Sequence, residues 1–365
     1  MANDLLKNEI IRLLQNNPEK ADIVKLLDFQ GEQQDLLLQT AAEIKNKYVG
    51  NIVYFRGLIE YSNICRKNCK YCGIRKDNTN LNRYTMTEQE VVDAALYAYR
   101  ENYASIALQS GELCSEKFVE NITSLLEKIN AETNNELGIT LSLGEQSEET
   151  LKMWKEKLGV RRYLLRIETS NRELYEKIHP DNEIHSYQKR LEVLKILRKL
   201  NYQVGTGVMI GLPFQTVENL ADDILFFKDF DVDMIGMGPY IEHYDTPLYE
   251  HKDRLLPLSE RFNLTLKMIA ICRIMFKDIN IVASTAMQAI ERTGREKAIK
   301  AGANIIMPNL TPQKYREDYL LYQNKPCTNE EANKCKNCLE TRIQLTGNNI
   351  GYGEWGDSKH FFNRQ

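Results

Sequence analysis

The stretch IVYFRGLIEYSNICRKNCKYCGIRKDN, residues 52–78, joins an apolar run directly to three closely spaced cysteines. Its apolar part, residues 52–62, predicts a β-strand. Seven more strands are expected further along, alternating with helical patterns, at residues 105–110, 138–143, 161–168, 203–211, 232–238, 279–285 and 303–309. Strands too apolar to alternate indicate a parallel sheet that is buried on both faces. The eight strand-and-helix units predict an α/β fold, a complete (β/α)8 barrel.

Two flanking segments lie outside these eight units. Residues 1–50 carry apolar residues at helical spacing, for example in DLLKNEIIRLL and KADIVKLLDF, and predict an N-terminal helical extension. Residues 311–365 contain three more cysteines and the sequence GYGEWGD, and we expect them to wrap the barrel. The predicted division is therefore an extension over 1–50, a barrel over 51–310 and a C-terminal segment over 311–365.

The composition is that of an ordinary soluble globular protein. The 365 residues are 42% hydrophobic and 27% charged, with a net charge of −3 and both signs interspersed. No basic surface suggests nucleic acid as a partner. Charges interrupt the N-terminus, which does not predict a signal peptide, and no apolar run reaches the ~18 residues of a membrane span. We expect a cytoplasmic, monomeric protein that does not bind membranes.

Cys65, Cys69 and Cys72 follow the first strand with C-x3-C-x2-C spacing. Thiolates select iron–sulfur clusters or zinc, and a 4Fe–4S cluster held only by protein needs four cysteines. Three cysteines on one loop would leave one iron open to S-adenosylmethionine (SAM), which can chelate it through its amino and carboxylate groups. One electron from the cluster would then release a 5′-deoxyadenosyl radical. The spacing therefore predicts a radical SAM enzyme.

A second group, Cys327, Cys335 and Cys338, has C-x7-C-x2-C spacing near the C-terminus. Three thiolates predict an auxiliary iron–sulfur centre, such as a 2Fe–2S cluster with an outside fourth ligand. Zinc is the alternative in both places. Its fourth ligand would be His179, His185 or His243 at the first group and His360 at the second.

Residues at the predicted carboxyl ends of the strands suit SAM, because a barrel of this kind carries its active site there. The tripeptide Ser110-Gly111-Glu112 ends the second strand and is a candidate for holding the SAM amino group. Glu168 ends the fourth strand, where a carboxylate can accept from ribose hydroxyls. Arg190, on a following helix, would pair with the SAM carboxylate. Gly211 would let the backbone approach the adenine or ribose.

Charged and polar residues inside the predicted barrel indicate an anionic substrate. Arg56 lies within the first strand and Arg166 within the fourth. An inward-facing arginine needs an anionic partner, since an unpaired buried charge is costly, and an amino-acid carboxylate is such a partner. The ends of other strands add further candidates: Thr140, Ser142, Ser284, Thr285, Met307 and Tyr315.

These motifs together resemble the FeFe-hydrogenase maturase (HydE) family, in the biotin-synthase-like branch of the radical SAM enzymes. The resemblance runs from AEIKNKYVGN, residues 42–51, to GEWG, residues 353–356. Its most specific strings are EYSNICRKNCKYCGIRKDN, LQSGE, TLSLGE, LLRIETSN, GTGVMIGLP, GPYIEHYDTPL, STAM and GANIIMPNLTP, with the three C-terminal cysteines. The family fold is a complete (β/α)8 barrel, which agrees with the strand count.

The resemblance implies a definite chemistry. Such an enzyme would cleave SAM and use the adenosyl radical on a small anionic, cysteine-derived iron carbonyl cyanide complex, during assembly of the FeFe-hydrogenase cofactor. It would take electrons from a donor such as ferredoxin or flavodoxin and work with two other maturases. Tyr71 would pack near the adenine. The substrate end of the cavity would be lined by Arg56, Thr140, Arg166, Ser284, Thr285, Met307 and Tyr315.

Two departures from the family pattern lie at the predicted rim. Phe214 stands where a glycine is expected, and residues 288–295 also differ from expectation. A methylornithine-synthase-like mutase, or another radical SAM enzyme acting on a small amino acid, is the alternative; we expect it to lack the C-terminal cysteines. Sulfur insertion of the biotin-synthase type is disfavoured, because ITLSL and VGTGVMIG carry no cysteine. An iron–sulfur carrier without turnover is the alternative from another class.

Overall fold

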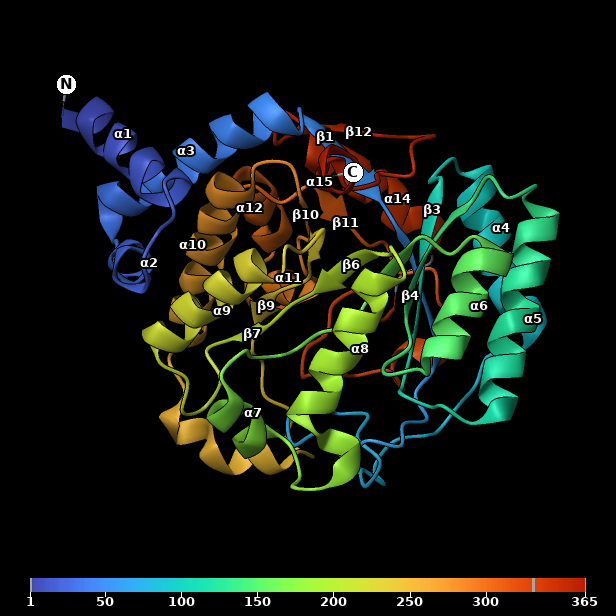
Figure 1. The fold of residues 1–365 in the computed structure, drawn as a ribbon. Helices are drawn as coiled ribbons and strands as arrows, with labels where there is room; N and C mark the ends of the chain where they lie inside the picture. The colour runs from blue at the N-terminus through green and yellow to red at the C-terminus, as the bar shows by residue number, and fades with distance from the viewer. Residues whose placement is uncertain (1, 330–331, 365) are drawn as a thin grey trace.

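The computed structural model describes residues 2–329 and 332–364, and its centre is a curled parallel sheet (Figure 1). Seven strands pair in the order β10-β8-β6-β5-β4-β3-β2, while β11, β1 and β12 form a second sheet and β7 pairs with β9. The bounds are β1 Ile52–Phe55, β2 Gly57–Ser62, β3 Ser105–Ser110, β4 Gly138–Ser142, β5 Arg162–Leu164, β6 Gln203–Thr206, β7 Met209–Ile210, β8 Met234–Ile235, β9 Gly238–Pro239, β10 Asn280–Ile281, β11 Ile305–Ile306 and β12 Asn349–Ile350.

Backbone hydrogen bonds connect the two main sheets around β11. β1 and β2 are one strand interrupted at Arg56, and β11 pairs in parallel with β1. On the side of β11 that faces β10, Asn304 N donates to Ile281 O and Ala283 N donates to Ile305 O, both at 2.9 Å. The prediction of an α/β fold around a curled parallel sheet is confirmed. The eight strands do not form one continuous ladder. β11 pairs with β1 over two residue pairs but meets the β10 strand through only one isolated bridge.

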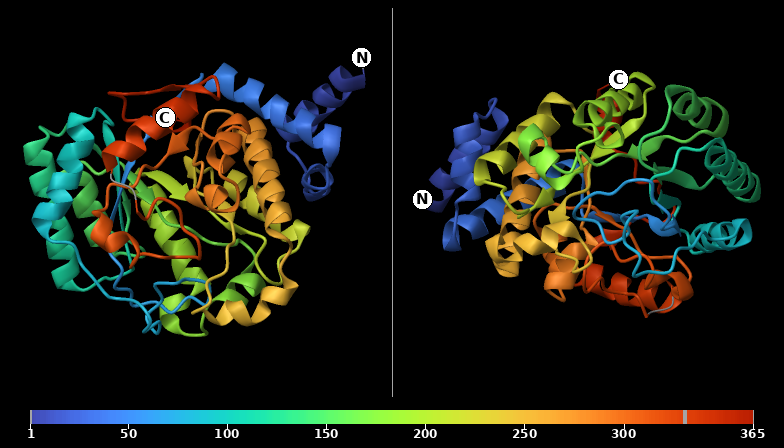
Figure 2. Two further views of the ribbon diagram at one scale, coloured as in Figure 1. Left: turned by 180° about the vertical axis from the view of Figure 1, so that it is seen from behind. Right: turned by 90° about the horizontal axis from the view of Figure 1, so that it is seen from below.

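Helices cover the outside of the sheet, with α4, α5, α6 and α8 following one another around it (Figures 1 and 2). A capping box at Thr87 and Glu90 begins α4: Thr87 Oγ1 accepts from Glu90 N at 3.3 Å. The helices have the bounds α4 Glu88–Arg100, α5 Glu116–Glu132, α6 Glu148–Leu158, α7 Arg172–Ile178, α8 Tyr187–Lys199, α9 Val217–Asp229, α10 Leu258–Phe276, α11 Thr285–Ile290, α12 Gly294–Lys300, α13 Gln313–Arg316, α14 Ala332–Gln344 and α15 Lys359–Asn363. Short 3-10 helices cover Glu183–His185 and Pro247–Arg254.

Three helices precede the first strand: α1 Ala2–Gln15, α2 Lys20–Leu27 and α3 Gly31–Tyr48. They lie beside α10 at one side of the sheet (blue in Figures 1 and 2). The division into an extension, a barrel and a C-terminal segment stays a prediction. In the described part of the chain, no helix is long and apolar enough to cross a membrane.

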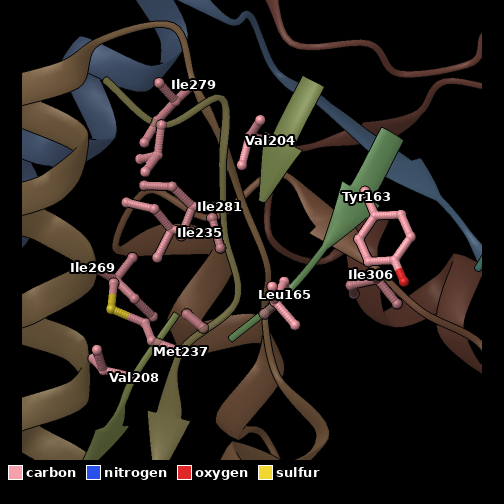
Figure 3. Packing of buried hydrophobic residues seen from close by; sticks show 14 of the residues in the cluster. Tyr163, Leu165, Val204, Val208, Ile235, Met237, Ile269, Ile279, Ile281 and Ile306 are labelled. Carbon is pink, nitrogen blue, oxygen red and sulfur yellow. The ribbon is translucent and has the colours of Figure 1, made fainter. Parts of the chain in front are cut away.

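Outward-facing apolar side chains of the strands form the main core against the helices. Ile235, Met237 and Ile281 gather near Ile269 of α10 (Figure 3). All four are buried, and burying such a side chain contributes about 1.5–3 kcal/mol relative to leaving it exposed. The opposite face of the same strands points into the barrel, which is where the polar and charged residues collect.

Residues 354–358, called the plug below, enter the amino-terminal end of the barrel. β12 pairs in parallel with β1 and brings the plug to that end. There Arg162 pairs with Asp357, its Nε donates to Thr140 Oγ1 at 2.8 Å, and its Nη2 donates to Ser105 Oγ at 2.6 Å. This part of the C-terminal segment is therefore a component of the barrel interior, in contrast to the expectation that it wraps the outside.

Candidate active site at the carboxyl ends of the strands

Cys65, Cys69 and Cys72 lie in the loop that follows β2, residues 63–87, called the cysteine loop below. The view from below places this loop across the carboxyl end of the barrel (blue in Figure 2, right). The three thiols are partly buried and within electrostatic range of one another. Burial, followed by the neighbouring thiols, raises the pKa of Cys69 to about 12 and that of Cys72 well above its usual value. The thiols therefore hold their protons until bound metal replaces them.

The three thiols do not form a compact single-ion site in the described part of the chain. Among the residues that the structure describes, no three His, Cys, Asp or Glu side chains converge closely enough for a single metal ion. Two histidines considered for zinc are also engaged elsewhere. His185 Nε2 accepts from Asn68 N at 2.8 Å, and His179 Nε2 lies 3.3 Å from the hydroxyl of Tyr71.

The guanidinium of Arg83 holds the cysteine loop in shape. It donates to five main-chain carbonyls, those of Asn63, Ile74, Arg75, Lys76 and Asn78. These carbonyls flank all three cysteines in the sequence. One side chain thus satisfies polar backbone groups that an irregular loop would otherwise leave without partners. Sequence reasoning missed Arg83, because nothing in the spacing marks it as different from other loop arginines.

Replacing Arg83 by alanine is expected to lower the affinity of the cysteine loop for its cluster about 10- to 100-fold, the usual effect of losing residues that orient metal ligands. Lysine restores little, because it lacks the planar fork that reaches several carbonyls. Iron content per chain after anaerobic reconstitution and the reduction potential of the cluster measure this. Lys76→Ala, which removes an exposed side chain of the same loop, is the control. An Arg83→Ala protein with normal iron content and potential would contradict the assignment.

The segment Ser110-Gly111-Glu112 packs directly against the cysteine loop. Gly111 N donates to Ser62 O at 2.7 Å, and Glu112 N donates to Cys65 Sγ at 3.3 Å. A Cβ on residue 111 would lie 2.4 Å from Ile64 O, so only glycine permits this approach. The structure therefore brings the tripeptide to the first cysteine, as its predicted position at the end of the second strand required.

A buried network of charges lies next to this contact. Glu112 is within 3.1–3.3 Å of Arg66, Lys67 and Arg190, while Glu145 lies 2.7 Å from both Lys67 and Arg190. Burial opposes ionisation of Glu145, but Arg190 and Lys67 outweigh it and lower its pKa. Three cations face two carboxylates, which leaves one excess positive charge and favours an anion nearby. Arg190 and Glu112 thus contact each other, although the sequence suggested separate roles for them.

Glu168 ends its strand in an unusual backbone conformation. Its φ is +67°, a left-handed value that a non-glycine residue adopts at an energetic cost. Its N–H donates to Gly207 O at 2.9 Å, and Arg166 Nη2 lies 2.9 Å from its carboxylate. Burial raises the pKa of Glu168, with Arg166 and Arg190 opposing this shift. The Glu168 carboxylate lies within electrostatic range of Tyr71 and Cys72 of the cysteine loop.

The turn after Glu168 is anchored by a fully buried carboxyl group, Asp223 of α9. Asp223 Oδ1 accepts from both Ser170 N and Ser170 Oγ at 2.6 Å. Burial raises its pKa from 3.8 to about 7, against the effect of the Ser170 hydrogen bonds. Because the folded state then binds more protons than the unfolded state between about pH 4 and 7, this group makes stability fall as pH rises through that window.

Replacing Asp223 by asparagine is expected to raise the free energy of unfolding at pH 8 by a few kcal/mol, at about 1.4 kcal/mol per pKa unit. Asparagine keeps an acceptor for Ser170 but cannot ionise, so the gain disappears near pH 4. Urea unfolding at both pH values measures the difference. Asp222→Asn, at an exposed pair with Lys20, is the matched control and should change stability by less than ~1 kcal/mol. A gain of equal size at both pH values would refute the titration of Asp223.

Tyr71 lies in a small apolar cluster beside the cysteine loop. Its ring meets that of His179 edge to face at 5.3 Å, and the buried members of the cluster are Leu174, Ile178, Leu212, Tyr240 and Leu248. Gly211 has φ +84°, and a Cβ there would lie 2.3 Å from Arg261 Cγ. The packing of Arg261 therefore requires glycine at position 211, independently of any contact with SAM. Phe214, where the family pattern suggests glycine, has φ +69°, the conformation that glycine prefers.

Arg56 and Thr140 lie in the layer of the barrel that the plug fills. Arg56 Nη2 donates to Gly356 O at 3.0 Å, and its Nη1 lies 3.0 Å from Met234 Sδ. Burial, followed by repulsion from Arg162, lowers its pKa. The inward direction of Arg56 was predicted correctly. Its partners were not, because the chain supplies the acceptor itself.

Tyr315, predicted to line the substrate cavity, points away from the barrel. Its hydroxyl donates to the carboxylate of Glu90 at 3.0 Å, and its ring stacks on Tyr84 at 4.5 Å. That prediction is wrong as to the position of the side chain. Tyr319, by contrast, is buried inside the barrel, and its hydroxyl accepts from Gln109 Nε2 at 3.2 Å. Neighbouring tyrosines in one short segment cannot be told apart from sequence, because the turn between them sets which one faces inward.

The other substrate candidates differ in their surroundings. Ser284 Oγ is buried without a hydrogen-bonding partner, and Met307 packs near Val282 and Ile305. Ser142, the last residue of β4, and Thr285, the first residue of α11, are partly exposed. Arg166 Nη2 donates to Val208 O at 3.0 Å, while its Nε is buried without a partner. Unused polar atoms of this kind leave hydrogen bonds for a ligand to complete.

Residues 319–327, called the strap below, run over the same end of the barrel. Gly73 N of the cysteine loop donates to Leu321 O at 3.0 Å, and Gln323 N donates to Glu242 O at 3.2 Å. Lys325 forms a buried ion pair with Glu60, which points inward from β2. Neither Glu60 nor Lys325 was predicted, since they come from opposite ends of the sequence. The strap thus connects the cysteine loop to β2 at this end of the barrel.

The second cysteine group is only partly described. Cys327, at the end of the strap, has φ +65° and is partly buried, whereas Cys338 on α14 is exposed. The side chain of Cys335 lies outside the described residues. His360, considered as a zinc ligand here, instead lies 2.6 Å from Asp231 and 3.3 Å from Asp278. The auxiliary cluster stays a prediction.

A curled parallel sheet whose first strand leads into three cysteines, with glycine, carboxylate and arginine residues around them, defines the class of radical SAM enzymes. Residues 59–227 match the model of the Radical SAM superfamily. The chain is 24% identical to a solved methylornithine synthase, with a TM-score of 0.78 over 95% of this chain and 98% of the other, a likeness of fold.

Sequence comparison identifies a family within the class of radical SAM enzymes. The chain is 44% identical over 330 residues to the [FeFe] hydrogenase maturase subunit HydE of Thermotoga maritima, covering 90% of each chain. It is 28% identical to the 3-methylornithine synthase of Methanosarcina acetivorans, over 78% of this chain and 77% of the other. The chain belongs to the HydE family of the radical SAM superfamily. Membership of this superfamily implies a 4Fe–4S cluster and SAM as cofactors.

Proposed function

We propose that this enzyme acts on a cysteine-derived iron carbonyl cyanide complex during assembly of the FeFe-hydrogenase cofactor. The observation that carries the proposal is the 44% identity to HydE over nine-tenths of the chain. Cys65, Cys69 and Cys72 would hold the 4Fe–4S cluster. The cluster and bound SAM together supply a 5′-deoxyadenosyl radical.

The residues around the cysteine loop would hold SAM. The excess positive charge on Arg66, Lys67 and Arg190 supports placing the SAM carboxylate there. Ser110-Gly111-Glu112 would receive its amino group. The proximity of the Glu168 carboxylate to Tyr71 and Cys72 supports hydrogen bonds to the ribose hydroxyls. The remaining SAM contacts in this proposal are Tyr71 and Gly211, at the adenine.

The barrel interior would hold the substrate. The unpartnered Nε of Arg166 and Oγ of Ser284 support binding of an anionic, hydrogen-bonding ligand. Thr140, Ser142, Thr285 and Met307 would complete the cavity, and Tyr319 replaces Tyr315 in it. Arg56 would contribute mainly its charge, since Gly356 already takes one of its hydrogen bonds. The strap would exclude water from the radical step.

Three accessory features belong to the same proposal. Cys327, Cys335 and Cys338 would hold an auxiliary 2Fe–2S cluster, for which Arg342 near Cys338 adds favourable charge. A reduced ferredoxin or flavodoxin would deliver the electron. Two other hydrogenase maturases would supply the substrate complex and receive the product.

The test has two stages. Reduced, anaerobically reconstituted protein is first incubated with SAM, and 5′-deoxyadenosine is measured. The same protein is then combined with the two partner maturases and apo-hydrogenase, and hydrogen evolution is measured against a mixture that lacks the chain. Formation of 5′-deoxyadenosine and dependence of hydrogen evolution on the chain are the expected results.

Each failure identifies an alternative. Cleavage of SAM without activation of hydrogenase would contradict the maturase role, and incubation with lysine would then test for 3-methylornithine, the product suggested by the 28% identical synthase. Absence of 5′-deoxyadenosine from protein with a full 4Fe–4S cluster would leave only an iron–sulfur carrier.

A further inference from the structure

Arg295, near the start of α12, is a buried arginine without a counter-charge. Only 3% of its surface is exposed, and its Nε is buried without a hydrogen-bonding partner. Among the described side chains, those of residues 3–329, 336 and 338–364, no carboxylate pairs with it and no oxygen accepts from its guanidinium. Burying a charge in this way costs folding free energy unless a partner arrives. The natural partner of a guanidinium is an anion that binds through two oxygens.

The place of Arg295 connects it to the barrel entrance. The phenol of Tyr322, in the strap, lies within electrostatic range of Arg295 and also of Cys327, Glu60 and Arg166. Arg295 is therefore beside the point at which the strap crosses the carboxyl end of the barrel.

Gln288 is a second residue with a buried polar atom that has no partner among the described side chains. Gln288 on α11 contacts Cys327 Sγ through its Nε2 at 3.9 Å, while its Oε1 is buried without a donor. Arg295 thus offers unused donors and Gln288 offers an unused acceptor. The two residues directly follow Gly294 and Met287, which are in contact, since a Cβ on Gly294 would lie 2.1 Å from Met287 O. Phosphate or sulfate would satisfy Arg295 but would face the amide oxygen of Gln288 with its own lone pairs. A ligand that carries a carboxylate and an ammonium satisfies both.

We propose that Arg295 and Gln288 form a binding site for a zwitterionic α-amino-acid group, with the carboxylate on Arg295 and the ammonium on Gln288 Oε1. The site deepens the proposed function, because Tyr322 lies within electrostatic range of both Arg295 and Arg166, a residue of the proposed substrate cavity. The choice of a cysteine-like ligand rests on the proposed function, whereas the site itself does not.

The experiment uses holoprotein with an oxidised cluster and saturating SAM, so that the SAM site is filled and no turnover occurs. S-methyl-L-cysteine is the probe, since it has no free thiol to attack the cluster, and calorimetry measures its binding. Arg295→Gln is expected to weaken binding about 10- to 100-fold, the loss that follows removal of a charged hydrogen-bonding partner. Gln288→Leu is expected to weaken it about fivefold or more. Arg292→Gln, at an exposed arginine of the same connection, should bind as the wild type does.

Two fragments of the probe test the zwitterion. 3-(Methylthio)propanoate lacks the ammonium and 2-(methylthio)ethylamine lacks the carboxylate, and each should bind about tenfold more weakly than the amino acid or worse. Equal binding of the propanoate would overturn the assignment in favour of a plain anion site. Unchanged binding by Arg295→Gln would overturn the site altogether.

Melting temperature separates this site from a structural role of Arg295. Because the ligand-free protein carries an unpaired charge, Arg295→Met should melt at the wild-type temperature or about 2–4 °C above it. The probe should raise the melting temperature of the wild type but not that of the variant. A marked fall in the ligand-free variant would show that Arg295 supports the fold. If wild type matures hydrogenase but binds no probe, this inference fails alone; if it binds the probe but does not mature hydrogenase, the proposed function fails alone.

Discussion

Changing Cys69 to serine is expected to reduce both iron incorporation and formation of 5′-deoxyadenosine to background. Cys69 is the middle cysteine of the loop, and its pKa of about 12 in the metal-free protein shows how strongly its surroundings oppose a bare thiolate. Iron binding offsets that cost with a thiolate–metal bond, which a serine hydroxyl cannot form at neutral pH. Iron per chain, the electron paramagnetic resonance of the reduced protein and the yield of 5′-deoxyadenosine are the measurements.

Cys114 provides the matched control for this substitution. It is an exposed cysteine that follows Ser110-Gly111-Glu112 in the sequence, and Cys114→Ser leaves all three loop cysteines in place. We expect wild-type iron content and full SAM cleavage from it. A Cys69→Ser protein that retains its 4Fe–4S signal would remove the cysteine loop from the proposed site, and equal losses in both variants would point to general damage.

Changing Arg162 to methionine is expected to destabilise the fold by about 3–5 kcal/mol, the range for removing one partner of a buried ion pair. Arg162 is fully buried and joins Asp357 of the plug to Thr140 and Ser105. Methionine fills a similar volume but leaves a carboxylate and two hydroxyls without a donor. The melting temperature should fall by roughly 5–15 °C. Thermal unfolding followed by circular dichroism measures this change.

Arg161 is the control for this second prediction. It precedes Arg162 in the sequence but is exposed, and its guanidinium stacks on the Trp355 ring at 4.5 Å. Arg161→Met should cost about 1 kcal/mol or less, as expected for an exposed cation–π contact. If both variants melt alike, the ion pair between Arg162 and the plug does not stabilise the barrel.

The order of strands and helices could be predicted from sequence because apolar runs and helical periodicity repeat along the chain. The lengths of the strands could not. The stretch 203–211 forms two short strands, and Gly207 lies where a Cβ would be 1.9 Å from Gly236 O. Such close approach depends on how strands curl against one another, which no local pattern records. Likewise, the break at 291–293 between α11 and α12 follows from contact of Gly294 with Met287.

The residues of the candidate site also fall into two groups, those that the sequence could locate and those that it could not. The cysteine spacing and the glycine, glutamate and arginine positions at strand ends are local, so sequence located them. Partners that come from distant parts of the chain were missed. Lys325 reaches Glu60, and Asp357 reaches Arg162, over separations of more than 190 residues. The misplacement of Tyr315 has the same origin, since the path of the chain after β11 decides which tyrosine turns inward.

The pairing of β12 with β1 has a consequence for how the protein folds while it is being synthesised. On the ribosome, β1 is the first barrel strand to emerge, yet its neighbour β12 and the plug, residues 349–358, are synthesised after every other strand. Arg56 and Arg162 must therefore remain without Gly356 and Asp357 while nearly the whole chain is made. At ~5–20 residues per second, this wait lasts on the order of tens of seconds. The nascent barrel is thus an open, partly charged shell, and a chaperone or an early metal donor would meet it before its amino-terminal end has closed.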